Sequence, residues 1–146
     1  DSFLLADASA QNPEYAVSLY YPGRNGLLVE RTQILNASDA AQLPLLALQG
    51  LISGTPVDPA RTVPAATQVL DFSITDATAN VVLSDAFMAC DTSDAAARGA
   101  VRSITATLCA LDGISAVQIS VIGEAGLTYI DISQPISPQS DWYAPQ

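Results

Sequence analysis

The spacing of hydrophobic residues is most regular in the segment 99–133, where it changes from helical to extended. Apolar residues first recur every three or four positions, at Val101, Ile104, Leu108 and Leu111. That spacing lines one face of a helix, and we predict a helix over 94–111. Alternation of apolar and polar residues then predicts strands at 117–121 and 129–132, reversing at 123–126. The segment therefore predicts a helix packed across a hairpin.

The same two patterns alternate through the rest of the chain. Extended segments are predicted at 15–21, 27–35, 67–76 and 79–84, and a helix is predicted at 39–53. Pro44 lies inside that helical stretch, and because proline fits only the first turn, regular helix should begin close to it. The order of elements is strand-strand-helix, strand-strand-helix, strand-strand. It predicts an α+β fold, with a mixed or antiparallel sheet and two main helices packed on one of its faces.

A single domain is predicted to account for most of the chain. At 146 residues the chain has a common domain length and is long enough to bury a core. We expect residues 1–14 to form a lead-in segment, residues 15–136 a single domain, and residues 137–146 a C-terminal tail. The chain begins at Asp1 and its only methionine is Met88. We therefore expect that an export signal or a lipid-anchored cysteine has been removed from the N-terminus.

Charge restricts the classes of partner. Fifteen acidic residues face five basic ones, which gives a formal net charge of −10, and all five basic residues are arginines. Nucleic-acid binding requires basic residues that neutralise phosphates, and adsorption to anionic lipid head groups requires them too. We therefore expect neither nucleic acid nor an anionic lipid surface as a direct partner.

No group of residues stands out as catalytic. The chain has no histidine and no lysine, which removes the commonest general base, many metal ligands and Schiff-base chemistry. Two carboxylate pairs, Asp91 with Asp94 and Asp71 with Asp76, are compatible with a hydrolase, but a helix start and a turn explain them better. The possible oxygen ligands at Asp91–Asp94 and at Asp112–Gly113 do not follow the spacing of an EF-hand. We expect no enzyme, no catalytic residue, no metal site, no cofactor and no small-molecule substrate.

The two cysteines, Cys90 and Cys109, are predicted to be free thiols. Cys90 precedes the start of the predicted helix, and Cys109 lies near its far end. At about 1.5 Å per residue the helix separates them by roughly 22 Å, whereas a disulfide requires Cα atoms within about 7 Å.

Four aromatic residues are the candidates for contact with a partner. Tyr20 and Tyr21 alternate across a predicted strand, so one of them should face solvent, and a strand there at a sheet edge would accept a partner strand. Trp142 and Tyr143 follow a proline-containing stretch near the C-terminus. Either Trp142 docks on the domain and holds the tail, or the pair is an exposed contact anchor. The docked arrangement is the favoured one.

Five segments resemble, in order, the motifs of one domain family. Val17–Pro22 resembles its opening strand, VxLYFP, and Leu27–Thr32 resembles the next strand, which ends in an acidic-Arg pair. Ala47–Pro56 resembles the helix end ALxxLLxGP, although Thr55 precedes the proline here. Val81–Phe87 resembles the strand that leads into DLSxxF, and Ile130–Ile136 resembles the closing LDLSxPL. By these motifs the chain resembles the GerMN domain family of bacterial sporulation and spore-germination proteins and envelope lipoproteins.

The resemblance implies a non-catalytic, extracytoplasmic interaction or assembly module that binds another protein or a second copy. It implies a location outside the cytoplasm of a spore-forming bacterium, peripheral to a membrane and anchored as a lipoprotein through an N-terminus that precedes this chain. The alternative is a ligand-binding or cell-wall-binding domain of an envelope lipoprotein in vegetative cells. An acidic-site hydrolase is a third hypothesis, which would require a cleft with converging carboxylates.

Overall fold

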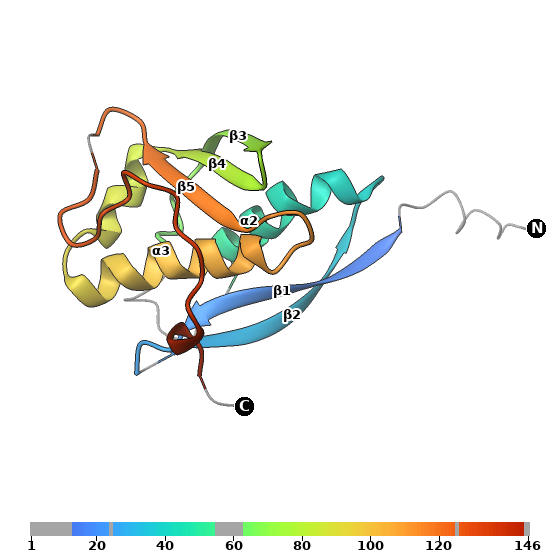
Figure 1. Ribbon diagram of the computed structural model, residues 1–146, viewed down its shortest axis with the longest axis horizontal. Helices are drawn as coiled ribbons and strands as arrows, with labels where there is room; N and C mark the ends of the chain where they lie inside the picture. Colours follow the sequence, from blue (N-terminus) through green and yellow to red (C-terminus); the bar gives the residue numbers. More distant parts are fainter. Residues whose placement is uncertain (1–12, 24, 55–62, 125, 145–146) are drawn as a thin grey trace, which may run out of the picture.

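The computed structural model describes residues 13–23, 25–54, 63–124 and 126–144. Two helices and five strands carry the fold, with short 3-10 turns between them (Figure 1). The strands are β1 (Glu14–Pro22), β2 (Leu28–Asn36), β3 (Val69–Thr75), β4 (Thr78–Leu83) and β5 (Ala116–Val121), and the helices are α2 (Leu43–Ser53) and α3 (Asp94–Cys109). The 3-10 turns are η1 (Ala40–Gln42), η3 (Asp85–Cys90) and η4 (Ser140–Trp142). The predicted α+β class is confirmed.

Local sequence signals explain where several elements begin and turn. Pro44 lies at the start of α2, as predicted. The hydroxyl of Ser93 accepts a hydrogen bond from the Ala96 N–H and caps α3. Asp76 and Ala77, which separate β3 from β4, both have positive φ, the pattern of a two-residue type I′ hairpin turn.

The strands form two sheets, where the sequence pattern predicted one. β1 and β2 form an antiparallel pair, and the second sheet has the order β3-β4-β5. In that second sheet β3 pairs antiparallel with β4, whereas β4 and β5 are parallel. A parallel pair requires a crossover, and α3 supplies it. This arrangement replaces the predicted helix across a hairpin.

The predicted strand at 129–132 is wrong, because these residues form no strand. β5 pairs with β4 on one side, and on the other it has only a bridge between Val117 and Ile136. Side chains hold the intervening segment instead. The Asp91 carboxylate accepts the N–H groups of Thr128 (2.8 Å) and Tyr129 (3.3 Å). These groups are therefore bonded to a carboxylate and not to a neighbouring strand.

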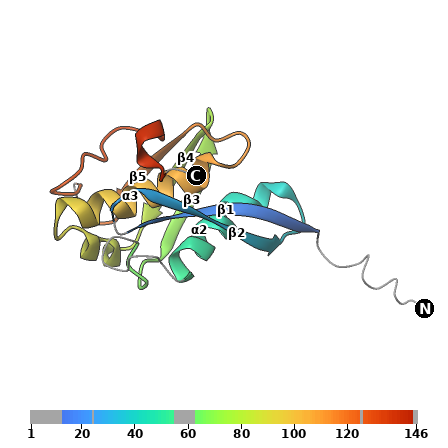
Figure 2. The ribbon, with the colours of Figure 1, turned by 90° about the horizontal axis from the view of Figure 1, so that it is seen from below.

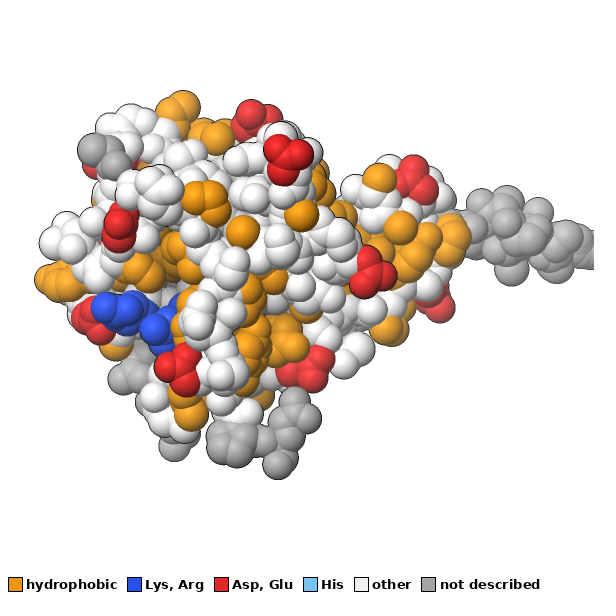
Figure 3. Space-filling view, viewed as in Figure 1, with side chains coloured by type: hydrophobic (Ala, Val, Ile, Leu, Met, Phe, Trp, Pro, Cys, Tyr) orange, Lys and Arg blue, Asp and Glu red, His pale blue; other side chains and the backbone are white. Residues whose placement is uncertain are grey.

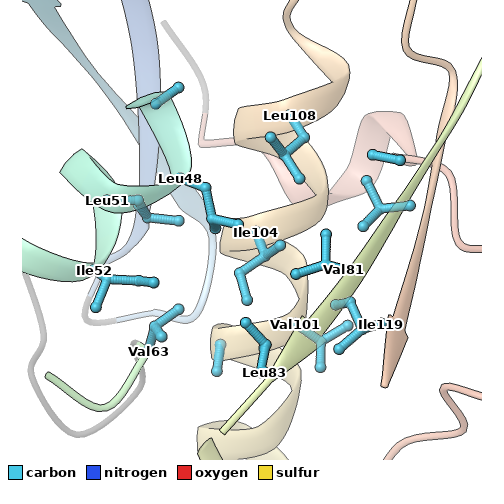
Figure 4. Close-up of a cluster of buried hydrophobic side chains, with 14 of the residues drawn as sticks. Leu48, Leu51, Ile52, Val63, Val81, Leu83, Val101, Ile104, Leu108 and Ile119 are labelled. Atoms are coloured by element: carbon cyan, nitrogen blue, oxygen red, sulfur yellow. The ribbon is translucent and has the colours of Figure 1, made fainter. Parts of the chain in front are cut away.

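The core lies around α3, which packs against β1 of one sheet and β5 of the other (Figure 1). Its inward residues Val101, Ile104 and Leu108 are fully buried. Figure 4 shows them between residues of α2, such as Leu48, and residues of β4, such as Val81. The apolar stripe predicted for this helix is therefore confirmed, but it faces α2 and the second sheet while the helix also contacts β1.

The predicted lead-in 1–14 lies mostly outside the described residues. No helix among the described parts of the chain is long and apolar enough to cross a bilayer.

Candidate interaction surface

The candidate aromatic residues occupy two different places. Tyr21 on β1 points into the core with only 2% of its surface exposed. Its hydroxyl donates to the Leu51 carbonyl oxygen at 3.4 Å, and the Arg31 guanidinium lies 5.6 Å from its ring centroid. Burial raises the pKa of Tyr21, while Arg31 acts in the opposite direction. Tyr21 therefore supports the core beneath β1 and offers no area to a partner.

Tyr20, Trp142 and Tyr143 lie together and attach the C-terminal tail to the domain. Trp142 is 6% exposed and packs with Leu28 and Ala106. Tyr143 meets Tyr20 edge to face, with ring centroids 5.3 Å apart and planes at 72°. Burial is the main cause that raises the pKa of both tyrosines. The docked arrangement predicted for Trp142 is the one that the structure has.

Arg102 on α3 completes this cluster. Its guanidinium lies 5.0 Å from the centroid of the Trp142 ring, within the range of a cation–π interaction. Burial lowers the pKa of Arg102, and neighbouring Arg98 acts in the same direction.

The tail also forms an isolated backbone bridge with β2. Tyr143 forms a parallel bridge with Leu28, and the Ala144 N–H donates to the Leu28 carbonyl oxygen at 2.9 Å. This pairing was not predicted, because no spacing pattern in a short tail specifies which strand it meets. It shows that the outer edge of β2 forms backbone hydrogen bonds with a neighbouring segment.

The opposite edge of the first sheet is closed by α3. The Tyr20 N–H on β1 donates to the Thr107 hydroxyl oxygen at 3.0 Å, so at this point a helix side chain takes the place of a neighbouring strand. β1 also contacts α3. The helix therefore occupies the edge of β1 at Tyr20, whereas Glu14 and Ala16 near the other end of the strand are exposed.

Beyond Leu28, β2 is mostly exposed. Residues 30–34 are all exposed, and Ile34 has 53% of its surface in contact with solvent. Seen from below, β1 and β2 lie in front of the helices (Figure 2). Among the described residues, no backbone hydrogen bond from a segment other than β1 reaches Glu30, Thr32, Ile34 or Asn36. We call this stretch, Glu30–Asn36, the open edge.

A second exposed feature lies where β3 extends past the core. Phe72 and Ile74 lie opposite the buried Val81 and Ala79, so they share the core-facing side of the sheet, yet Ile74 is exposed. Phe72 also lines a groove of about 470 Å³ beside the start of α2. Its other lining residues are Asn36, Ala41, Gln42, Leu45 and Leu46.

The carboxylates singled out in the sequence have separate structural roles. Asp91 holds the segment at Thr128, as described above, and Asp94 forms an exposed ion pair with Arg98 at 2.7 Å. Asp71 accepts the N–H of Phe72 at 3.0 Å. Across the described parts of the chain, no three His, Cys, Asp or Glu side chains are grouped to hold a metal. Acidic side chains are spread over the face in Figure 3 rather than gathered in a cleft.

Cys90 and Cys109 are free and lie near opposite ends of α3. Burial raises the pKa of the Cys90 thiol to about 12, with a smaller effect from Asp91. Burial also raises the pKa of the Cys109 thiol to about 11. Both are therefore protonated near neutral pH, the weakly nucleophilic form of cysteine.

The described residues form a small α+β domain with an open sheet edge at β2 and an apolar core around a central helix. The family model for sporulation and spore germination (Germane) matches residues 18–126. The chain belongs to this family. A search of curated protein sequences found no match.

Solved structures support the same fold. The tandem GerMN domains of the sporulation protein GerM from Bacillus subtilis match with a TM-score of 0.63 and 25% identity, over 86% of this chain and 46% of that one. The first GerMN domain of GerM matches with a TM-score of 0.58 and 24% identity, over 89% and 97% of the two chains. A candidate lipoprotein from Clostridium perfringens matches with a TM-score of 0.59 and 20% identity, over 88% and 89%. This chain therefore has a GerMN-like fold.

Proposed function

We propose that this chain is a non-catalytic protein-interaction module that acts outside the cytoplasm during sporulation or spore germination. Its membership of the sporulation and spore germination family is the observation that carries the proposal. The open edge of β2 supports it, because unpaired backbone groups on an exposed strand are suited to strand addition. In this proposal the partner is another protein or a second copy, and no catalysed reaction is involved.

We further propose that residues 15–136 form the GerMN-like domain and that residues 137–146 are a tail that packs on it. The cluster of Tyr20, Trp142 and Tyr143 supports this division, because it joins the end of the tail to β1. In our proposal a lipid anchor that precedes this chain holds the domain near a membrane. The similarity of fold to a candidate lipoprotein supports that location.

The second candidate function is binding of a ligand or cell-wall component by an envelope lipoprotein of vegetative cells. The groove beside Phe72 and Leu46 favours it, because apolar concave surfaces are where small ligands usually bind.

The test is the count of heat-resistant spores in a strain that lacks this gene, compared with its parent and with the complemented strain. We expect the deletion to lower the count by orders of magnitude and the intact gene to restore it. An unchanged count would contradict a role in spore formation. Normal spores with slow germination would place the role in germination, whereas a defect only in vegetative growth would favour the second candidate.

A further inference from the structure

We propose that the open edge of β2 pairs antiparallel with β2 of a second copy, with Gln33 on the two-fold axis. The inference rests on the proposed function, because it names the partner of the interaction module as the chain itself. The two antiparallel sheets, each formed by β1 and β2, would then join into one continuous sheet across the interface.

The direction of the backbone groups follows from hydrogen bonds on both edges. The Tyr20 N–H points away from β2, toward Thr107, and Tyr20 is opposite Glu30. In an antiparallel ladder such a pair is not hydrogen-bonded, so the N–H and C=O of Glu30 point outward. The Leu28 carbonyl, two residues earlier, also points outward and accepts from Ala144. The period of two places Thr32, Ile34 and Asn36 in the same orientation.

The extent of the open edge locates the axis. At one end the tail occupies the edge beside Leu28, and at the other β2 ends at Asn36. The stretch between them is Glu30–Asn36, and its midpoint is Gln33. An antiparallel pair of two copies overlaps over the whole stretch only when the axis passes through that residue.

Two of the cross-strand pairs favour the same register, while Arg31 faces Leu35 of the second copy. With Gln33 on the axis, Thr32 faces Ile34 of the second copy, and two β-branched side chains make a favourable cross-strand pair. Glu30 then faces an Asn36 side chain that is able to donate a hydrogen bond. Each copy also covers the exposed Ile34 of the other.

The neighbouring registers are worse. An axis on Glu30 sets two carboxylates opposite each other, and an axis on Arg31 does the same with two guanidinium groups; like charges in such positions are destabilising. An axis on Thr32 sets Asn36 against Leu28, where the tail already occupies the edge. An axis between two residues is excluded. Residues whose backbone N–H and C=O point outward would then lie opposite residues whose N–H and C=O point toward β1, and the two strands could not form hydrogen bonds.

The edge of β3 is a poorer site for the same interaction. Counting from the two-residue turn that follows Thr75, the Phe72 N–H points away from β4. The carboxylate of Asp71 already accepts it at 3.0 Å. A strand that added there would have to displace this carboxylate, whereas no such bond is found on the open edge within the described residues.

The net charge of −10 sets the conditions for association. Two copies repel each other at low ionic strength, and salt screens that repulsion. We therefore expect dimerisation to become tighter as salt concentration rises, the opposite of what an interface held by ion pairs would show.

Cysteine substitutions along the strand test the register directly. In a non-hydrogen-bonded antiparallel pair the opposed Cα atoms lie about 4.5 Å apart, within the range of Cα separations that a disulfide spans. We expect Gln33→Cys to form a covalent dimer under mild oxidation several-fold faster than Thr32→Cys or Ile34→Cys. The unsubstituted chain, with Cys90 and Cys109 intact, gives the background. Faster cross-linking of Thr32→Cys, or equal rates for all three variants, would overturn the assignment of the axis.

A second variant separates this inference from the proposed function. Thr32→Pro removes an outward N–H, and proline is tolerated on edge strands. We expect it to remain folded by circular dichroism and to lose dimerisation in sedimentation. A monomeric wild-type chain at high protein and salt concentration would overturn the inference.

If the wild-type chain were monomeric and Thr32→Pro failed to restore spores in the deletion strain, the edge would bind a strand of another protein, and the proposed function would stand without the dimer. If the deletion itself had no effect on spores, the proposed function would fail whatever the cross-linking showed.

Discussion

The two ends of β2 belong to one strand and one sheet, yet they have opposite surroundings. At Leu28 the strand is 2% exposed, covered by Trp142 and bonded to the tail through Ala144. From Glu30 to Ile34 every residue is exposed. The difference shows that a strand able to pair with a neighbour is left open over most of its length. The stability lost when the contacts at Leu28 are removed would show how much pairing contributes. At the open edge, a partner would have to supply the equivalent contacts.

The largest loss of stability is expected from replacing Trp142, the aromatic residue that covers β2 at Leu28. Trp142→Ala should lower the free energy of unfolding by about 3 kcal/mol, because it removes a buried aromatic side chain that covers Leu28. Urea unfolding measures the change. Tyr129→Ala, which truncates an exposed aromatic ring, is the control and should change the value by less than about 0.5 kcal/mol. Equal effects of the two substitutions would show that the tail does not close this end.

A smaller effect is expected at the edge of β1. Thr107→Val removes the hydroxyl that accepts the Tyr20 N–H and should cost about 1 kcal/mol, because a partly buried donor loses its partner. Thr105→Val is the matched control on the same helix. Thr105 is equally buried, but its hydroxyl donates to the Val101 carbonyl oxygen within the helix. A larger loss for the control would contradict the closure of this edge by α3.

The Arg102 guanidinium beside the tail should contribute no more to stability than the Thr107 hydroxyl. Arg102→Gln removes the guanidinium over the Trp142 ring and should cost about 1 kcal/mol. Arg98→Gln, which breaks an exposed ion pair with Asp94, should cost no more than about 0.5 kcal/mol. Thermal unfolding of the two variants tests which substitution costs more stability. A larger loss for Arg98→Gln would show that the cation–π contact does not stabilise the tail.

The smallest change in stability is expected at the open edge. Ile34→Ser replaces a side chain that is already exposed and should alter monomer stability by less than about 0.5 kcal/mol. Its effect should appear in association, because Ile34 faces Thr32 of the second copy in the proposed dimer. Sedimentation should show weaker dimerisation than for the wild type. A large loss of monomer stability would mean that the chain itself covers this edge.

Local patterns in the sequence predicted the elements but not all of their partners. The spacing of Val101, Ile104 and Leu108 identified α3, and Pro44 marked the start of α2, because both signals depend on residues within a few turns. The alternation at 129–132 was misleading, because alternation does not reveal whether a neighbouring strand is available. β5 instead pairs with β4 across a helix, and such pairing depends on contacts far apart in the sequence.

The candidate surface was predicted in part. The sequence indicated that Trp142 would dock and that one of Tyr20 and Tyr21 would face solvent. The structure buries Trp142 and Tyr21, but Tyr20 is half-buried against Tyr143. It did not indicate that Tyr20 and Tyr143 meet, or that β2 would carry the open edge. Which strand lies at an edge depends on the topology of the whole chain, and β2 has an ordinary strand composition.

Amide hydrogen exchange at Thr32 and Ile34, followed against protein concentration, tests the central claim most directly. In dilute protein at low salt both N–H groups should exchange rapidly, while the Tyr20 N–H, bonded to Thr107, should be protected. At high protein and salt concentration the two open-edge amides should become protected, and in Thr32→Pro the Ile34 amide should not. Protection of Thr32 and Ile34 already in the dilute monomer, or rapid exchange at every concentration, would contradict the account.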